Sequence, residues 1–156
     1  MGTGYMFKCI KCEHEYEVSI GIGAFFPTEY EKCVKDIMRG KLGDEWKSIF
    51  LNNSAAVDAK KYLYLCKSCG NWKVDRSYSV YIYEYELFPK SLCLYSYNID
   101  DTYKFVKSYY HKWSKCGKRI SKVNTNHDLS ISLACPKCGK ENYYHEILMW
   151  DWLNSC

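Results

Sequence analysis

The pattern of hydrophobic and polar positions predicts an amphipathic helix close to the N-terminal end of the chain. Its apolar side chains recur at i, i+3, i+4, i+7 and i+8, at Tyr30, Cys33, Val34, Ile37 and Met38. Thr28 and Glu31 form a capping box at its start, and Gly40 is placed to end it. A second, shorter helix is predicted from Asp44 to about Leu51, so that residues 27–52 form a helical insertion.

Alternating runs predict strands on both sides of this insertion. Residues 16–20 alternate between apolar and polar side chains, residues 61–65 are typical of a strand that leads into Cys66, and a long β pattern runs from 72 to about 87. The polar and small residues 52–59 predict a loop, whereas residues 102–109 predict one or two helical turns. Together these elements predict an α+β fold.

Ten cysteines in 156 residues add a constraint that the hydrophobic pattern does not contain. Cys9 and Cys12, like Cys66 and Cys69, are separated by two residues, a spacing that lets both thiolates of a pair bind one ion. Two such pairs predict a closed, structural zinc site held by these four sulfurs. The alternatives are free buried cysteines, two disulfides, an iron site or a redox pair. A redox pair would lie at the start of a helix, whereas the residues after both of these pairs are predicted to continue as strands.

A second group of cysteines follows later in the chain. Cys135 and Cys138 form a further pair with two-residue spacing. A second pair that ends at Cys116 would complete a four-cysteine site with them. The first member of that pair is missing, however, because Trp113 stands three residues before Cys116. A second zinc ion held by three cysteines needs a fourth ligand, and His111 is the nearest in sequence. The alternatives are no bound metal or one of four other ligands: His127, His145, Cys93 and Cys156.

The cysteine groups also indicate a weak internal repeat. Each half of the chain has an early group, a later group and a strand leaving each of them. Pro89 lies in the segment 88–101, which is the best candidate for a boundary. The repeat predicts a zinc ribbon with a helical insertion at 1–88 and a second zinc-ribbon-like unit, with an altered metal site, at 89–156.

These motifs resemble tandem zinc-ribbon proteins, and in particular a group of small bacterial proteins with a helical insertion in the first ribbon. The similarity runs along most of the chain: Phe7-Lys8-Cys9, the helix entered from Phe26-Pro27, the stretch from Gly43 to Lys47, and the two later cysteine groups. The resemblance implies small antiparallel β zinc-ribbon units and bound zinc, and it implies no reaction. In that group the string after a histidine like His111 reads Cys-Pro-x-Cys, where this chain has Trp113-Ser114-Lys115-Cys116.

The net charge of +4 is concentrated in one segment. Residues 102–127 hold seven Lys and Arg side chains and no Asp or Glu, and aromatic residues are interleaved among them. Cationic side chains attract the phosphate backbone and aromatic rings stack on bases, so this segment predicts nucleic-acid binding. The alternative is a solvated, lysine-rich face over a core of tyrosines. The candidate binding residues are Lys112, Lys115, Lys118, Arg119 and Lys122.

Several function classes are disfavoured by missing motifs. The sequence has no phosphate-binding glycine loop, metalloprotease helix, nucleophile elbow or deaminase signature, so we do not expect an enzyme. It has no apolar run that would serve as a signal peptide or membrane span, so we expect a cytoplasmic location and no membrane partner. The prediction is a non-catalytic zinc-ribbon binding or adaptor protein that binds nucleic acid through residues 102–122. The alternative is a protein-interaction module that regulates or inhibits a larger enzyme by direct contact.

Overall fold

The computed structural model describes residues 2–22, 26–52, 54–83, 103–114, 116–124, 132–142 and 144–148. They form two compact units, and each unit is assembled from several stretches of the chain. Unit 1 combines the described residues of 1–23, 61–75 and 110–153, and unit 2 combines those of 24–60 and 76–109. The sequence predicted consecutive units, 1–88 and 89–156, whereas strand pairing within unit 1 joins residues from both of those ranges.

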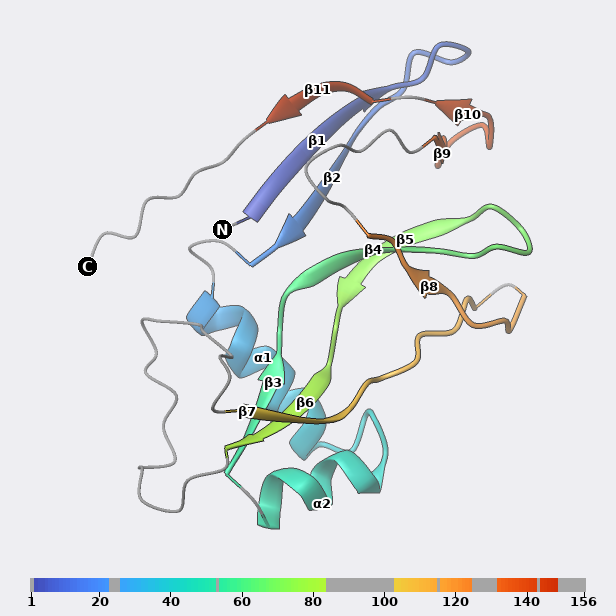
Figure 1. The fold of residues 1–156 in the computed structure, drawn as a ribbon. Coiled ribbons are helices and arrows are strands. Elements are labelled where there is room, and N and C mark those ends of the chain that lie inside the picture. The colour runs from blue at the N-terminus through green and yellow to red at the C-terminus, as the bar shows by residue number, and fades with distance from the viewer. Residues whose placement is uncertain are drawn as a thin grey trace. The chain divides into compact units, whose positions relative to one another are not determined.

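Unit 1 is built from strands (Figure 1). Its main sheet has the order β11-β1-β2-β4-β5 with β8 paired to β4, and β9 and β10 form a separate two-stranded sheet. The bounds are β1 (Gly2–Lys8), β2 (Glu15–Gly21), β4 (Lys61–Leu65), β5 (Trp72–Arg76), β8 (Ser121–Lys122), β9 (Leu133–Ala134), β10 (Glu141–Asn142) and β11 (Tyr144–Leu148). Because β1 is antiparallel to both β2 and β11, the first and last described strands are neighbours.

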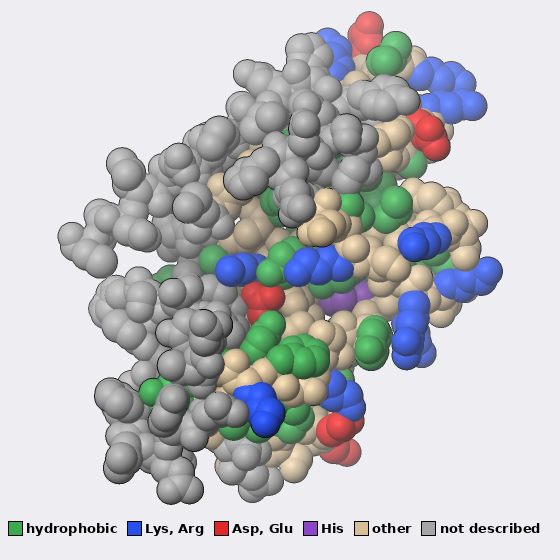
Figure 2. All heavy atoms as spheres, viewed as in Figure 1, with side chains coloured by type: hydrophobic (Ala, Val, Ile, Leu, Met, Phe, Trp, Pro, Cys, Tyr) green, Lys and Arg blue, Asp and Glu red, His purple; other side chains and the backbone are tan. Residues whose placement is uncertain are grey.

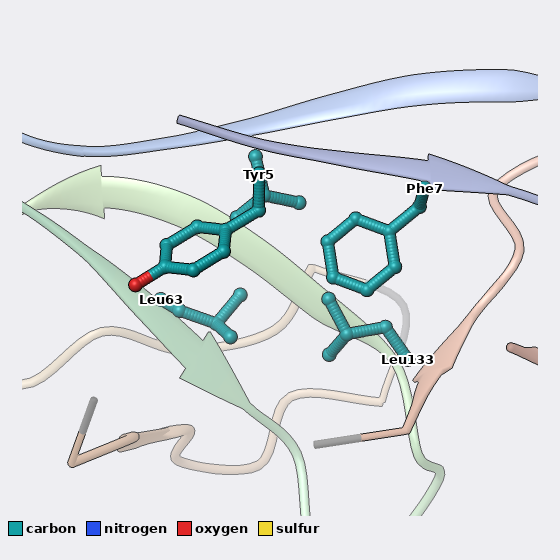
Figure 3. Close-up of a cluster of buried hydrophobic side chains, with 5 residues drawn as sticks. Tyr5, Phe7, Leu63 and Leu133 are labelled. Carbon is teal, nitrogen blue, oxygen red and sulfur yellow. The ribbon is translucent and has the colours of Figure 1, made fainter. Parts of the chain in front are cut away.

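The core of unit 1 lies against β1. Tyr5 and Phe7 are two residues apart, so their rings lie on the same side of the strand, where they face Leu63 and Leu133 (Figure 3). Val18 from β2 completes this cluster, and all of its members except Tyr5 are fully buried. Burial of each such side chain contributes about 1.5–3 kcal/mol, so these residues are a main source of the unit's stability.

Aromatic stacking joins β1, β2 and β5, and one hydrogen bond joins β5 to the small β9–β10 sheet. The ring of Tyr16 stacks on Phe7, with centroids 5.1 Å apart, and on Trp72, with centroids 5.6 Å apart. The indole N–H of Trp72 then donates to the carbonyl oxygen of Ala134 at 2.6 Å. The chain just before Cys135 is thereby fixed against the main sheet.

Unit 2 contains two helices and a three-stranded sheet. The helices are α1 (Phe26–Met38) and α2 (Asp44–Asn52), and the sheet has the order β3-β6-β7, with β3 (Ala55–Asp58), β6 (Ser79–Tyr83) and β7 (Tyr103–Lys107). Cys33 and Ile37 form the fully buried side of α1. Arg76 binds the buried carboxylate of Glu29, and Trp46 donates from its indole to the carbonyl oxygen of Tyr78 at 3.2 Å. Neither described helix is long and apolar enough to cross a membrane.

The predicted α+β class is confirmed, and both predicted helices are present. The predicted start of the first one is wrong, because α1 begins at Phe26 and Thr28 therefore lies inside the helix rather than capping it. Two further local predictions are wrong. The expected loop at 52–59 contains β3, whose Ala56 and Val57 are fully buried because the strand packs between β6 and the helices. The expected helical turns at 102–109 form β7, because the rings of Tyr103 and Phe105 pack across the sheet on those of Tyr83 and Tyr81.

The long β pattern predicted from 72 to 87 is divided in the structure. It forms β5 and β6, and Tyr78 between them has a positive φ of 52°. Residues 84–87, the last part of this predicted pattern, lie outside the described residues.

Candidate metal centres

The structure gathers seven cysteines of unit 1 into two clusters. The first cluster contains Cys9, Cys12, Cys135 and Cys138, and the second contains Cys66, Cys69 and Cys116. The predicted pairing of Cys9 and Cys12 with Cys66 and Cys69 is therefore wrong. The physical reason is the sheet order: β1 pairs with β11, which follows the Cys135–Cys138 loop, and β4 pairs with β8, which follows Cys116.

The sulfur positions fit tetrahedral metal coordination. Facing sulfurs are 3.5 Å apart between Cys9 and Cys138 and 3.7 Å apart between Cys12 and Cys135. Sulfurs at about 2.3 Å from a tetrahedral zinc ion lie about 3.8 Å from one another, whereas a disulfide requires about 2.05 Å. The first cluster thus has the ligand type, number and spacing of a closed zinc-ribbon site.

The four loops that carry the clusters share one backbone hydrogen-bond pattern. In each loop the N–H of the first position donates to the carbonyl of the residue five positions later, and the N–H of the fifth position donates back to the first carbonyl. The first position is Cys9, Cys66, Trp113 or Cys135, and the eight N···O distances lie between 2.7 and 2.9 Å. These loops are called knuckles below.

The fifth position of every knuckle has a positive φ, which the reversal of the chain requires. The residues there are Glu13 at 54°, Gly70 at 67°, Gly117 at 65° and Gly139 at 71°. Glycine adopts this conformation without steric cost, whereas Glu13 adopts it with some strain. The equivalence of the four loops is therefore visible in both their hydrogen bonds and their dihedral angles.

Trp113 occupies the first ligand position of the knuckle that contains Cys116. Its N–H bonds to the carbonyl of Lys118 at 2.9 Å, and its carbonyl accepts from Gly117 at 2.8 Å. The backbone of a metal-binding loop is thus retained although an indole replaces a thiol. The ring packs against a small cluster that includes Tyr64 and Cys66.

His111, the predicted fourth ligand, does not belong to the second cluster. It lies two positions before Trp113, and the residues at the same position of the other knuckles, Phe7, Tyr64 and Leu133, are core residues. His111 follows the same rule: it is 3% exposed, and its ring lies 4.4 Å from that of Tyr64. Its Nδ1 atom is 3.2 Å from a carboxylate oxygen of Asp75.

The structure does not describe the side chains of the other four ligands considered. His127, Cys93 and Cys156 lie outside the described residues, and the side chain of His145, in β11, is not described. Cys33 is fully buried in unit 2, and this burial raises the pKa of its thiol to about 12, as expected of a small core residue.

Hydrogen bonds and neighbouring thiols move the cysteine pKa values in opposite directions. Burial raises the pKa of Cys9, but backbone N–H groups and Cys12 outweigh it and lower the pKa to about 6. The side-chain amide of Asn71, 3.2 Å from the sulfur, and its backbone lower the pKa of Cys69 to about 7. At Cys12 a backbone N–H lowers the pKa, but burial and adjacent thiols raise it to about 12. Adjacent thiolates repel each other, and a divalent cation would remove this repulsion.

The predicted nucleic-acid residues lie on and next to the Trp113–Cys116 knuckle. The described ones, Lys112, Lys118, Arg119 and Lys122, are all exposed, and Lys115 lies outside the described residues. The guanidinium of Arg119 lies 4.1 Å above the ring of Tyr110, and the ammonium of Lys122 lies 3.2 Å above that of Tyr62. Figure 2 shows Lys and Arg side chains gathered over the tip of the β4–β5 hairpin and the chain before β8.

No protein-family model, curated protein or solved structure gives a significant match to this chain. The assignment of the two clusters therefore rests on their geometry and on the chemistry of their ligands.

Proposed function

We propose that this chain is a non-catalytic zinc-ribbon protein that binds nucleic acid through the exposed cations around its Trp113–Cys116 knuckle. In this proposal Cys9, Cys12, Cys135 and Cys138 hold a structural zinc ion. Four thiolates leave no open coordination position, so a zinc ion held there supplies folding free energy and no reaction.

The observation that carries the nucleic-acid proposal is the pairing of exposed cations with aromatic rings. Arg119 lies over Tyr110, which is 59% exposed, and Lys122 lies over Tyr62 on the neighbouring strand β4. Cations supply attraction to phosphates, and an exposed aromatic face supplies a platform on which a base stacks. Lys112 and Lys118 extend the same surface.

The knuckle segments of the second cluster are more positively charged than those of the first, as this proposal requires. The knuckle segments of the second cluster, 64–73 and 111–120, contain no Asp or Glu. Those of the first cluster, 7–16 and 133–142, contain Glu13, Glu15 and Glu141 beside their lysines. A polyanion would therefore bind at the second cluster rather than the first. Asp75 lies just outside these segments in sequence, and Lys73 and His111 pair with it.

Fluorescence anisotropy with labelled single- and double-stranded oligonucleotides, over a series of salt concentrations, tests the proposal. We expect the combined changes Lys118→Ala, Arg119→Ala and Lys122→Ala to weaken binding at least tenfold and to reduce the salt slope by about 2 for single strands and about 3 for duplexes. The matched control removes three cations from the first cluster's knuckles, through Lys11→Ala, Lys137→Ala and Lys140→Ala. Equal losses in both variants, or no binding at low salt, would exclude the proposed surface.

A second candidate function, protein interaction, is favoured by a different surface. Phe105 is 55% exposed and Val106 is 39% exposed on β7, which ends the strand order of its sheet among the described residues. Such an edge is suited to direct contact with a larger protein, which the chain would regulate or inhibit. Phe105→Ser should abolish capture of a single dominant partner while leaving oligonucleotide binding unchanged, whereas the Lys and Arg variants should have the opposite effect.

A further inference from the structure

The second cluster provides three corners of a coordination tetrahedron. The sulfur of Cys116 lies 3.7 Å from that of Cys66 and 3.9 Å from that of Cys69, which matches the separation of about 3.8 Å expected around tetrahedral zinc. The three sulfurs thus have the spacing of the first cluster, where four are present. Among the described residues one corner is without a thiol, because Trp113 stands at the first position of its knuckle.

This incomplete cluster is more accessible than the complete one. Cys69 and Cys116 are both exposed and only Cys66 is buried, whereas Cys138 is the single exposed member of the first cluster. Three protein ligands around zinc leave a position for a ligand from outside, which distinguishes open sites from closed structural ones. His111 does not close the second cluster, because it packs on Tyr64 and pairs with Asp75.

The surroundings favour a negatively charged fourth ligand. Three thiolates on a divalent ion leave a net charge of −1, and the two knuckle segments around them contain six Lys or Arg residues and no carboxylate. The indole N–H of Trp113, whose ring packs against Tyr64 and Cys66, is buried and has no acceptor among the described residues. A soft anion matches both the local charge and the three ligands already present.

We propose that Cys66, Cys69 and Cys116 bind a zinc ion whose fourth ligand is a thiolate supplied from outside the chain. The thiolate comes from a small thiol or from a cysteine of another molecule, and the chemistry at the cluster is the same in both cases. The proposal goes beyond nucleic-acid binding and does not depend on it. In this proposal the fourth ligand of the second cluster exchanges with thiols in solution, whereas the four ligands of the first cluster all belong to the chain.

Replacement of zinc by Co²⁺ in the full chain tests this proposal, because the visible absorption of tetrahedral cobalt reports its ligands. We expect two metal ions per wild-type chain and one in Cys116→Ser. Addition of glutathione should change the Cys116-dependent part of the spectrum and leave the remainder unchanged. A single-cysteine peptide is the second arm: equal effects assign the ligand to a free thiol, a stronger effect of the peptide assigns it to a protein cysteine, and both support the proposal.

Trp113→Cys provides the decisive variant, because the knuckle backbone is already that of a ligand loop. This change should close the second cluster, abolish the response to glutathione and increase metal retention against a chelator at least tenfold. Trp113→Phe is the control and should keep the response. The proposal is overturned if Cys116→Ser retains both metal ions, if glutathione leaves the wild-type spectrum unchanged, or if Trp113→Cys responds as the wild type does. The first two results do not require Trp113→Cys to fold.

Discussion

The two cysteine clusters of unit 1 share a backbone design and differ in what fills one position. The knuckles of both have the same hydrogen bonds and a positive φ at the fifth position. Among the described residues, however, one cluster has four thiols and the other has three, with Trp113 at the remaining ligand position of its knuckle. The loop that contains Trp113 keeps its shape because the backbone bonds and the packing of the indole on Tyr64 and Cys66 hold it. The shape of a metal-binding loop and its full set of ligands are therefore separable properties.

Removing one thiol from each cluster gives the largest expected difference. Cys135→Ser should abolish the cooperative unfolding of unit 1, since structural zinc sites in small peptides contribute about 10–16 kcal/mol of apparent binding free energy. Cys116→Ser should leave a cooperative transition. Zinc content and thermal melts followed by circular dichroism, with and without chelator, measure both effects.

The control for these variants is Cys33→Ala, which removes a buried sulfur that belongs to neither cluster. We expect it to retain the zinc content of the wild type. A Cys135→Ser protein that melts like the wild type would contradict the structural role of the first cluster.

The residue two positions before each knuckle provides the next comparison. Phe7→Ala should lower the free energy of unfolding by about 3–5 kcal/mol, because it opens a cavity in the unit 1 core. His111→Ala should cost less, about 1–3 kcal/mol, because Asp75 keeps its pairing with Lys73. Urea unfolding measures both changes. Ile10→Ala is the control, since Ile10 is 85% exposed and its loss should matter by less than about 0.5 kcal/mol.

Asn71 gives a smaller effect that should be confined to the second cluster. Its amide N–H donates to the sulfur of Cys69 at 3.2 Å and lowers the pKa of that thiol. Asn71→Ala should weaken metal retention there about tenfold, as the loss of an outer hydrogen bond to a ligand typically does. Because the pKa of Cys69 would rise, metal release should also move to a higher pH. Chelator competition on the Cys116-dependent cobalt absorption measures both, with Ser68→Ala as the control in the same loop.

The smallest effects should come from the fifth position of the knuckles in the first cluster. Gly139→Ala places a side chain at a φ of 71° and should cost about 1 kcal/mol, although its Cβ would meet no atom within 4 Å. Glu13→Gly removes a side chain from a position with positive φ and should therefore stabilise the protein by about 0.5 kcal/mol. A destabilising Glu13→Gly, measured by urea unfolding, would mean that the Glu13 side chain contributes more than its backbone strain costs.

Local sequence signals predicted local structure well where they were physically complete. The spacing of apolar residues predicted α1, because that signal lies within the helix itself, whereas the capping box at Thr28 and Glu31 did not mark its start at Phe26. The segment 103–107 was predicted as helical turns because its strand conformation depends on the rings of Tyr81 and Tyr83, which are more than 15 residues away. β3 was missed for a similar reason, since its burial depends on β6 and the helices.

The candidate site was predicted in its residue types and not in its pairing. Two-residue spacing identifies which cysteines share a loop, but it contains no information on which loops meet. Strand order decides that, and β1 pairs with β11 across nearly the whole chain. One signal did exist for His111: the residues two positions before the three cysteine pairs are Phe7, Tyr64 and Leu133, which suggests a core position rather than a ligand.

The nested order of the knuckles also determines when each cluster is complete during synthesis. The contact between Cys66 and Cys116 closes a loop of 50 residues, and the contact between Cys9 and Cys138 closes one of 129. The longer loop costs only roughly 0.8 kcal/mol more in chain entropy, so the two differ little at equilibrium. During synthesis they differ more, because Cys12 precedes its partner Cys135 by 123 residues, whereas Cys69 precedes Cys116 by 47. Over this longer interval the thiols of Cys9 and Cys12 are available to metal buffers, oxidants and chaperones, and the inner cluster can close before the outer one.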